Sequence, residues 1–130
     1  MRVVIALCLA LFFVACSERT TAPPPGATAV KSYPAHGKQV RIVRSDLPPG
    51  SSYEVLAALK AIEGGYGELA TAERKLADDA RAIGADAVIN VKVWHAPRFG
   101  AWAAPHAEGV AVKITKPESV NLDQVPGNWY

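Results

Sequence analysis

The spacing of apolar residues changes abruptly at Gly84, and this change constrains the fold of the chain more than any other feature. In residues 68–84, ELATAERKLADDARAIG, apolar side chains recur every three or four positions, the period of one face of an α-helix. In residues 86–94, DAVINVKVW, they alternate as in a β-strand. Glycine at the junction supplies the left-handed residue that ends many helices. The sequence predicts a strand directly after a helix at 68–83, whose apolar face comprises Leu69, Ala72, Leu76, Ala80 and Ile83.

The same periods predict which side chains are solvated and which face the core. The charged residues of the helix lie outside its apolar stripe and are expected to be solvated. They are Glu73, Arg74, Lys75, Asp78, Asp79 and Arg81. The strand alternation places Ala87, Ile89, Val91 and Val93 on one face. Between helix and strand, Asp86 is interpreted as a structural residue that bonds nearby backbone amides.

Three further segments have the pattern of strands. Residues 109–116, GVAVKITK, and residues 39–43, QVRIV, both alternate, and residues 53–62, YEVLAALKAI, begin to alternate after the turn formers SDLPPG. We expect 39–43 and 53–62 to pair as antiparallel strands, while the Ala, Leu, Glu and Lys of 53–62 leave a helix open as the alternative. The prediction is an α+β domain over 38–116, in the order ββαββ, with a small sheet of about four strands and one amphipathic helix on one face.

The N-terminus has the features of a signal peptide. Arg2 precedes an uncharged apolar run over residues 3–15, which is shorter than the roughly 20 residues that span a bilayer as a helix. The run ends in Phe13-Val14-Ala15-Cys16, which resembles the box of bacterial lipoprotein signals. That resemblance implies removal of 1–15 and acylation of Cys16, with palmitate-type chains as the covalent lipid. A secreted protein cut near Ala15 and keeping a free thiol is the alternative.

Cys16 is the only cysteine that would remain after processing, because Cys8 lies in the signal. The sequence therefore excludes an internal disulfide, a cysteine-based zinc site and a cysteine nucleophile from the domain. Several acyl chains make membrane attachment stable. Ser17, rather than Asp, follows the cysteine, which favours the outer membrane facing the periplasm over retention in the inner membrane.

The segments on either side of the domain are rich in proline or polar residues. Residues 16–37 hold the lipidated cysteine and a Pro-rich tether, of which 28–33 alternatively folds back as an edge strand. Residues 117–130 are expected to form a mobile C-terminal tail. After processing, 13 basic and 12 acidic side chains remain and the basic ones are dispersed, so we expect no nucleic-acid partner.

The run LADDARAIGADAVINVKVW, a connection, and then AEGVAVKI resemble the core of YbjQ-like domains and of the stress-sensing lipoprotein of the Rcs phosphorelay. The shared features are an Ala-rich helix, a Gly-Ala-Asp corner, an apolar strand and a Gly-x-Ala return strand. The resemblance implies the fold, the lipid anchor and the tether. The sensor's cysteines have no counterparts in this domain.

Two candidate sites lie in the connection HAPRFGAWAAPH and just before it. Exposed aromatic residues beside an arginine are enriched at protein interfaces, and they are Trp94, Arg98, Phe99 and Trp102. The alternative is that some of them complete the core. His95 and His106 would bind Zn²⁺ or Cu²⁺ if a third ligand, Glu108 or His36, joined them; two solvated histidines are the alternative.

No paired carboxylates, Ser-His-Asp set or nucleophile elbow is evident, so we expect no enzyme and no cofactor beyond the lipid. The predicted function is that of a membrane-anchored lipoprotein in the periplasm that binds an envelope protein in sensing or assembly. A periplasmic metal-binding protein that uses His95 and His106 is the alternative, and the sequence leaves a homo-oligomer open.

Overall fold

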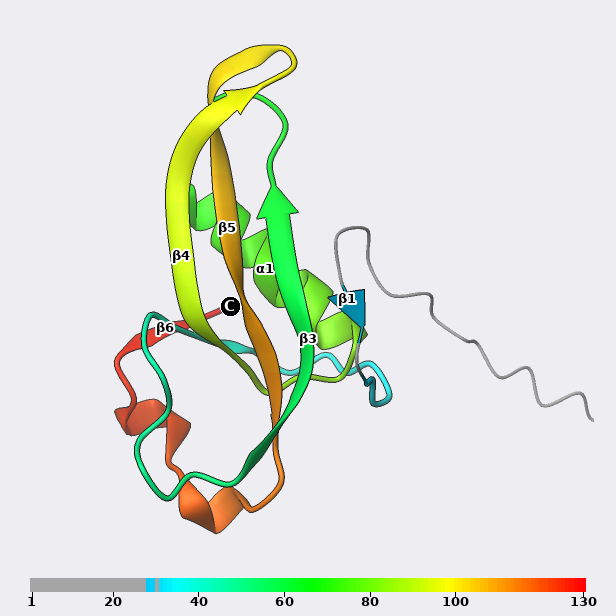
Figure 1. Ribbon diagram of the computed structural model, residues 1–130, viewed down its shortest axis with the longest axis vertical. Coiled ribbons are helices and arrows are strands. Elements are labelled where there is room, and N and C mark those ends of the chain that lie inside the picture. The colour runs from blue at the N-terminus through cyan, green and yellow to red at the C-terminus, as the bar shows by residue number, and fades with distance from the viewer. Residues whose placement is uncertain (1–27, 30) are drawn as a thin grey trace, which may run out of the picture.

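The computed structural model describes residues 28–29 and 31–130 (Figure 1). The predicted signal peptide, Cys16 and most of the predicted tether lie outside these residues. The elements in chain order are β1 (Thr28–Ala29), β2 (Arg41–Val43), β3 (Tyr53–Ile62), α1 (Leu69–Ala82), β4 (Ala87–Arg98), β5 (Ala101–Ile114), the short 3-10 helices η1 (Pro117–Ser119) and η2 (Leu122–Gln124), and β6 (Gly127–Trp129). In the described part of the chain, no helix is both long and apolar enough to cross a membrane.

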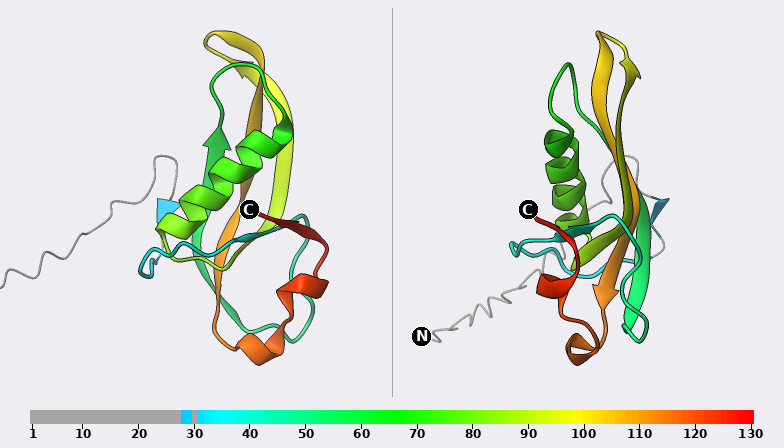
Figure 2. Two further views of the ribbon diagram at one scale, coloured as in Figure 1. Left: turned by 180° about the vertical axis from the view of Figure 1, so that it is seen from behind. Right: turned by 90° about the vertical axis from the view of Figure 1, so that its left-hand side faces the viewer.

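The fold is α+β, and one mixed sheet holds the two-residue β1 and five longer strands, in the order β1-β3-β5-β4-β2-β6. The predicted order ββαββ describes β2, β3, α1, β4 and β5, but the expected count of four strands is too low. Residues 53–62 form a strand rather than the alternative helix. Helix α1 covers one face of the sheet (Figure 2).

The predicted pairing of the first two long strands is wrong. Strand β2 runs parallel to β4, whereas β3 is antiparallel to β5 on the other side of the β4–β5 hairpin. The reason is the burial of β2, whose three residues are all buried. A strand that is buried on both faces belongs inside a sheet with neighbours on each side.

Helix α1 is confirmed close to its predicted bounds, and Ala72, Leu76 and Ala80 are fully buried in the main core. Its C-terminus closes with two backbone bonds, from the Gly84 amide to the Arg81 carbonyl and from the Ala85 amide to the Ala80 carbonyl. Gly84 has a φ of +78°, and a Cβ there would lie 2.7 Å from the Cβ of Tyr33. Glycine is therefore required both by the turn and by the chain that crosses it.

Glu73 does not lie on a solvated face, in contrast to the prediction. Its side chain is buried and accepts hydrogen bonds from the Arg44 guanidinium and, at 2.6 Å, from the Tyr130 hydroxyl. Glu73 shares the buried face of α1 with Leu76 and Ala77, three and four positions further on, so its predicted place outside the apolar stripe is wrong. The C-terminal residue then covers it, which no local pattern indicates.

The chain after residue 116 belongs to the domain and is not a tail. Strand β6 pairs with β2, and Val40 and Tyr130 exchange backbone hydrogen bonds at 2.8 and 3.2 Å. The buried Arg41 guanidinium donates from Nε and Nη2 to the Val125 carbonyl, at 3.2 and 2.5 Å. The C-terminal segment thus fills the open edge of β2 and supplies the acceptor that Arg41 needs.

The domain also begins before residue 38, as the alternative for 28–33 predicts. Strand β1 pairs with β3, and the amides of Lys31 and Tyr33 donate to the Leu56 and Ile83 carbonyls, each at 2.9 Å. Further along, His36 Nε2 lies 2.7 Å from the Ala85 carbonyl oxygen.

The alternation in β4 shifts at Asn90, so the predicted face of this strand is wrong. Asn90 has a φ of +53°, and the pairing of β4 with β5 changes register between Ile89 and Lys92. Val91 therefore faces the main core under α1, whereas Ile89 belongs to the second core on the opposite face. Gly109 lies against this bulge, since a Cβ there would be 2.7 Å from Val88.

Candidate functional site

The connection expected between Trp94 and His106 is a continuation of the two strands. Arg98 pairs with Ala101, and only Phe99 and Gly100 form the turn, with Gly100 at a φ of +89°. The hairpin therefore reaches the upper end of the molecule in Figure 1. A long hairpin with a short turn presents its terminal side chains on a rigid support.

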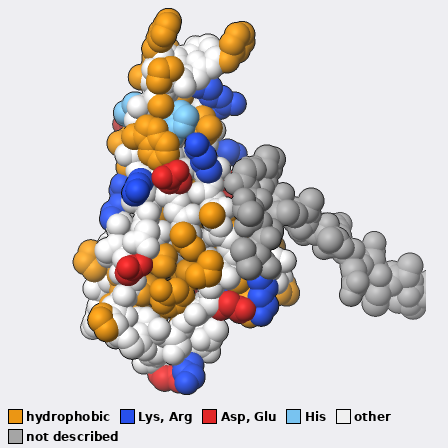
Figure 3. Space-filling view, viewed as in Figure 1, with side chains coloured by type: hydrophobic (Ala, Val, Ile, Leu, Met, Phe, Trp, Pro, Cys, Tyr) orange, Lys and Arg blue, Asp and Glu red, His pale blue; other side chains and the backbone are white. Residues whose placement is uncertain are grey.

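The end of this hairpin carries exposed aromatic side chains. Phe99 is completely exposed, with a relative accessibility of 106%, and Trp102 is 84% exposed. Tyr66, 68% exposed, comes from the GGYG segment before α1, and its hydroxyl accepts a hydrogen bond from the Trp102 amide at 3.3 Å. We call Tyr66, Arg98, Phe99 and Trp102 the aromatic tip. Figure 3 shows hydrophobic side chains at this end, with Lys and Arg side chains below them.

The segment before α1 braces the hairpin. The Glu63 amide donates to the Pro105 carbonyl at 3.0 Å, and His95 Nε2 lies 3.0 Å from the Gly67 carbonyl oxygen. Arg98 Nη1 donates to the Ile62 carbonyl at 3.4 Å. These contacts hold the tip in place while leaving the Phe99 and Trp102 rings in water.

Trp94 does not belong to the aromatic tip, although it was predicted with its residues. It lies opposite His106 across the hairpin, and the two rings stack with centroids 5.4 Å apart. Lys60 Nζ is 5.9 Å from the Trp94 ring centroid. Trp94 is half-buried and covers His106, so it completes the sheet face, as the alternative interpretation of these aromatics predicts.

The predicted metal ligands are not brought together. His106 pairs with Trp94 across the hairpin, and the preceding residue, Pro105, pairs with His95. Because successive residues of a strand point to opposite faces, the two histidines lie on opposite faces of the hairpin. His36 bonds Ala85 at the other end of α1. Within residues 28–29 and 31–130, no three His, Cys, Asp or Glu side chains lie close enough to hold a metal ion. His106 is buried, and neither ring nitrogen has a hydrogen-bond partner among the described residues.

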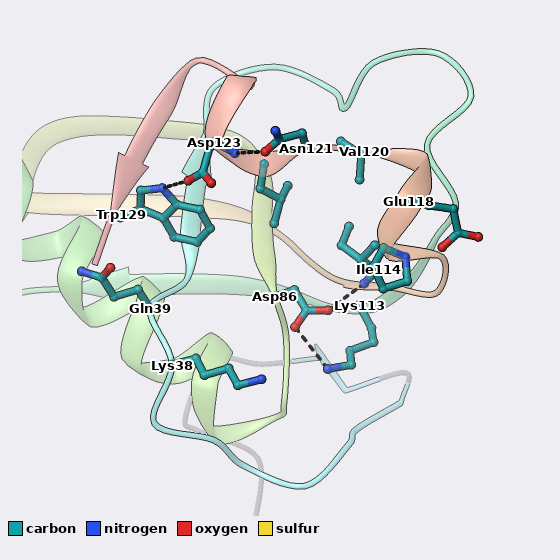
Figure 4. Close-up of a pocket in the computed structure, with 12 residues that line it drawn as sticks. Lys38, Gln39, Asp86, Lys113, Ile114, Glu118, Val120, Asn121, Asp123 and Trp129 are labelled. Carbon is teal, nitrogen blue, oxygen red and sulfur yellow. Dashed lines mark hydrogen bonds and ion pairs between the residues drawn. The ribbon is translucent and has the colours of Figure 1, made fainter.

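A second site, which the sequence did not indicate, is an open groove of about 820 Å³ at the end of the sheet away from the aromatic tip (Figure 4). Its walls come from the segment before β2, the β4–β5 ends and the C-terminal segment. Asp86 lies in it and accepts from Lys113 Nζ at 3.1 Å and from the Ile114 amide at 2.9 Å. The structural role predicted for Asp86 is confirmed, but its amide partner lies on the neighbouring strand β5, 28 residues further along the chain.

Four described side chains have shifted pKa values. The pKa of Glu54 is lowered by hydrogen bonds from Lys31 and Tyr33, and the pKa of Lys31 is raised by its bond to Glu54. Burial raises the pKa of Asp79. Burial, followed by the hydrogen bond to Glu73, raises the pKa of Tyr130. All four lie away from the aromatic tip.

No protein-family model matches the chain, and no curated protein or solved structure matches it significantly. The resemblance to YbjQ-like domains and to the Rcs lipoprotein therefore stays a prediction.

Proposed function

We propose that the protein is a lipid-anchored lipoprotein of the outer membrane that faces the periplasm and binds an envelope protein through its aromatic tip. The observation that carries the proposal is the exposure of Phe99 and Trp102 at the end of a braced hairpin. Large aromatic side chains are costly to leave in water, and Trp, Tyr and Arg dominate the binding energy of protein interfaces. Three of the four predicted binding residues, Arg98, Phe99 and Trp102, gather at this point.

The partner that fits such a tip is a protein with a concave apolar pocket. A flat partner would contact only the ends of the two rings, whereas a pocket would surround Phe99 and Trp102 and remove them from water. The tip has little charge of its own, with Arg98 as its one ionised side chain. We therefore expect an apolar pocket with an acceptor group at its rim.

The lipid anchor fits a role in sensing or assembly at the envelope. Residues 17–27 separate Cys16 from β1, and an extended chain of that length reaches roughly 34 Å at about 3.1 Å per residue. The domain can therefore stand away from the bilayer and meet partners in the periplasm. In this proposal the protein binds its partner and performs no chemistry on it.

Photo-crosslinking from the tip in intact envelopes tests the proposal. Benzoylphenylalanine replaces Phe99 in the lipidated chain, and in the matched control it replaces Val55, an exposed apolar residue of β3 away from the tip. We expect one envelope protein to be captured from position 99 and not from position 55, and to be lost on Trp102→Ala.

The affinity is then measured with the purified partner. Trp102→Ala is expected to weaken binding by at least about 30-fold, the 2 kcal/mol typical of a hot-spot residue. Crosslinking of position 99 to lipid alone, or to a second copy of this chain alone, would overturn the proposed partner. Equal capture from both positions would show that the tip is not the contact.

A further inference from the structure

The groove at the other end of the sheet has an apolar floor and one fixed aromatic wall. Ile114, Val120 and Leu122 are half-buried against the second core and line the groove. The Trp129 indole is held on two sides, because its Nε1 donates to Asp123 at 3.1 Å and the Arg41 guanidinium lies 5.1 Å from its ring centroid. A volume of about 820 Å³ is in the range of sites that enclose small organic ligands.

Apart from Asp86, which pairs with Lys113, the charges around this floor are separated by sign. Lys38 and Lys113 lie on one side of the groove, and Glu118 and Asp123 lie on the opposite side (Figure 4). Lys113 is neutralised by Asp86, whose second oxygen is occupied by the Ile114 amide. Among the ion pairs of the described residues, none includes Lys38 or Glu118. Among the described residues, Lys38 is therefore the one cation of the groove without an ion pair, and Glu118 and Asp123, on the other side of the apolar floor, are two carboxylates without one.

We propose that this groove binds a short apolar peptide with free termini. The peptide carboxylate pairs with Lys38, its ammonium group pairs with Glu118, and its side chains lie on Ile114, Leu122 and Trp129. A simple anion would meet Glu118 and Asp123, and a simple cation would meet Lys38, the lysine of the groove that has no ion pair among the described residues. Only a ligand that carries both charges and an apolar body matches all of the walls. The inference does not rest on the proposed function, since the groove and the aromatic tip share no residue.

Calorimetric titration of the full chain, kept in solution with detergent, tests this site with trileucine as the probe. Three forms of the peptide separate the contributions: with both termini free, with an acetylated N-terminus, and with an amidated C-terminus. We expect the free peptide to bind, and each cap to weaken binding by about fivefold, the contribution of an exposed ion pair.

Variants assign each terminus to its partner. Lys38→Gln should weaken binding of the free peptide about fivefold and leave binding of the amidated peptide unchanged. Glu118→Gln should weaken binding of the free peptide about fivefold and leave binding of the acetylated peptide unchanged. The matched control is Lys116→Gln, because Lys116 lies outside the groove, and it should leave binding of every peptide unchanged. Lys38, Glu118 and Lys116 are all exposed. Equal binding of capped and free peptides, variants without effect, or no binding at millimolar trileucine would each overturn the proposal.

Discussion

The aromatic residues at the C-terminus and at the hairpin tip are held in different ways. At the C-terminus, Trp129 bonds Asp123, and Tyr130 bonds the buried Glu73 and pairs with Val40 through its backbone. At the hairpin tip, Phe99 is fully exposed and Trp102 is held only through its backbone amide. Aromatic side chains with polar partners and burial stabilise the fold, whereas those displayed on a braced turn are available to another molecule. Residue type alone does not separate these two roles.

Removing β6 gives the largest expected effect. A chain that ends at Pro126 loses β6, one of the two strands that pair with β2, and loses the Tyr130 hydroxyl that covers and bonds Glu73. We expect a loss of at least about 4 kcal/mol in the free energy of unfolding, because a buried hydrogen-bonded network and a strand pair are broken together. Thermal unfolding should show a fall in Tm of at least about 15 °C.

Removal of the two aromatic side chains at the tip is the matched control. The double substitution Phe99→Ala with Trp102→Ala should change the free energy of unfolding by no more than about 0.5 kcal/mol, as expected for exposed side chains. If the tip variant were as unstable as the shortened chain, the tip aromatics would be part of the fold and the contrast between the two ends would be wrong.

Two glycines sharpen the same contrast in the backbone. Gly84 and Gly100 both have positive φ values, +78° and +89°, so alanine is strained at either position. A Cβ at Gly84 also meets Tyr33 at 2.7 Å and the Pro34 carbonyl at 2.8 Å, whereas at Gly100 it meets nothing within 4 Å. We expect Gly84→Ala to cost about 3 kcal/mol in denaturant unfolding and Gly100→Ala about 1 kcal/mol. Equal costs would mean that the crossing at Gly84 relaxes freely.

The parts of the fold that could be predicted from the sequence are those set by neighbouring residues. The helix, the strands after it and the stop at Gly84 follow from apolar period and backbone preference. Phe99 and Trp102 could also be predicted as interface candidates, because they are aromatic residues near Arg98 in the connection between two predicted strands. Local pattern therefore located the candidate tip, while Trp94 was misplaced because its cover of His106 depends on strand register.

The parts that could not be predicted depend on contacts between distant segments. The parallel pairing of β2 with β4 and the addition of β6 join residues far apart in the chain. The acceptor for Arg41 is Val125, and nothing near Arg41 in the sequence indicates it. The groove is likewise assembled from four separate segments, so its residues have no shared motif.

Tyr130 gives the fold a dependence on alkaline pH. Its folded-state pKa is raised above the unfolded value of about 10, first by burial and then by the bond to Glu73. The folded state therefore holds this proton more tightly, and its contribution is complete below pH 10 and is lost as pH rises toward the folded pKa. Tyr130→Phe should lower stability at neutral pH by about 1 kcal/mol, the value of one hydrogen bond, and flatten the decline above pH 10. Urea unfolding from pH 8 to 11 measures both effects, and an unchanged alkaline slope would contradict the assignment.

Glu54 repeats this arrangement at the surface and should give the smallest effect. Like Glu73 it accepts from a tyrosine, here Tyr33 at 2.5 Å, and it also pairs with Lys31 at 2.6 Å. Its folded-state pKa is lowered by Lys31 first and Tyr33 second, so its contribution is present above the ordinary value of 4.5 and is lost as pH falls through the lower folded value.

Glu54→Gln should therefore leave a slightly less stable protein at pH 7 and reduce the difference in stability between pH 5 and pH 3. Urea midpoints across this range measure the effect, with Glu118→Gln, an exposed carboxylate without an ion pair among the described residues, as the control. We expect burial, and not the tyrosine–glutamate contact itself, to decide how much each carboxylate contributes to stability. If Glu54→Gln lost as much free energy of unfolding as the chain that ends at Pro126, this expectation would be wrong. The two carboxylates have the same kind of partner and differ mainly in exposure, so the ratio of their effects measures what the C-terminal cover contributes.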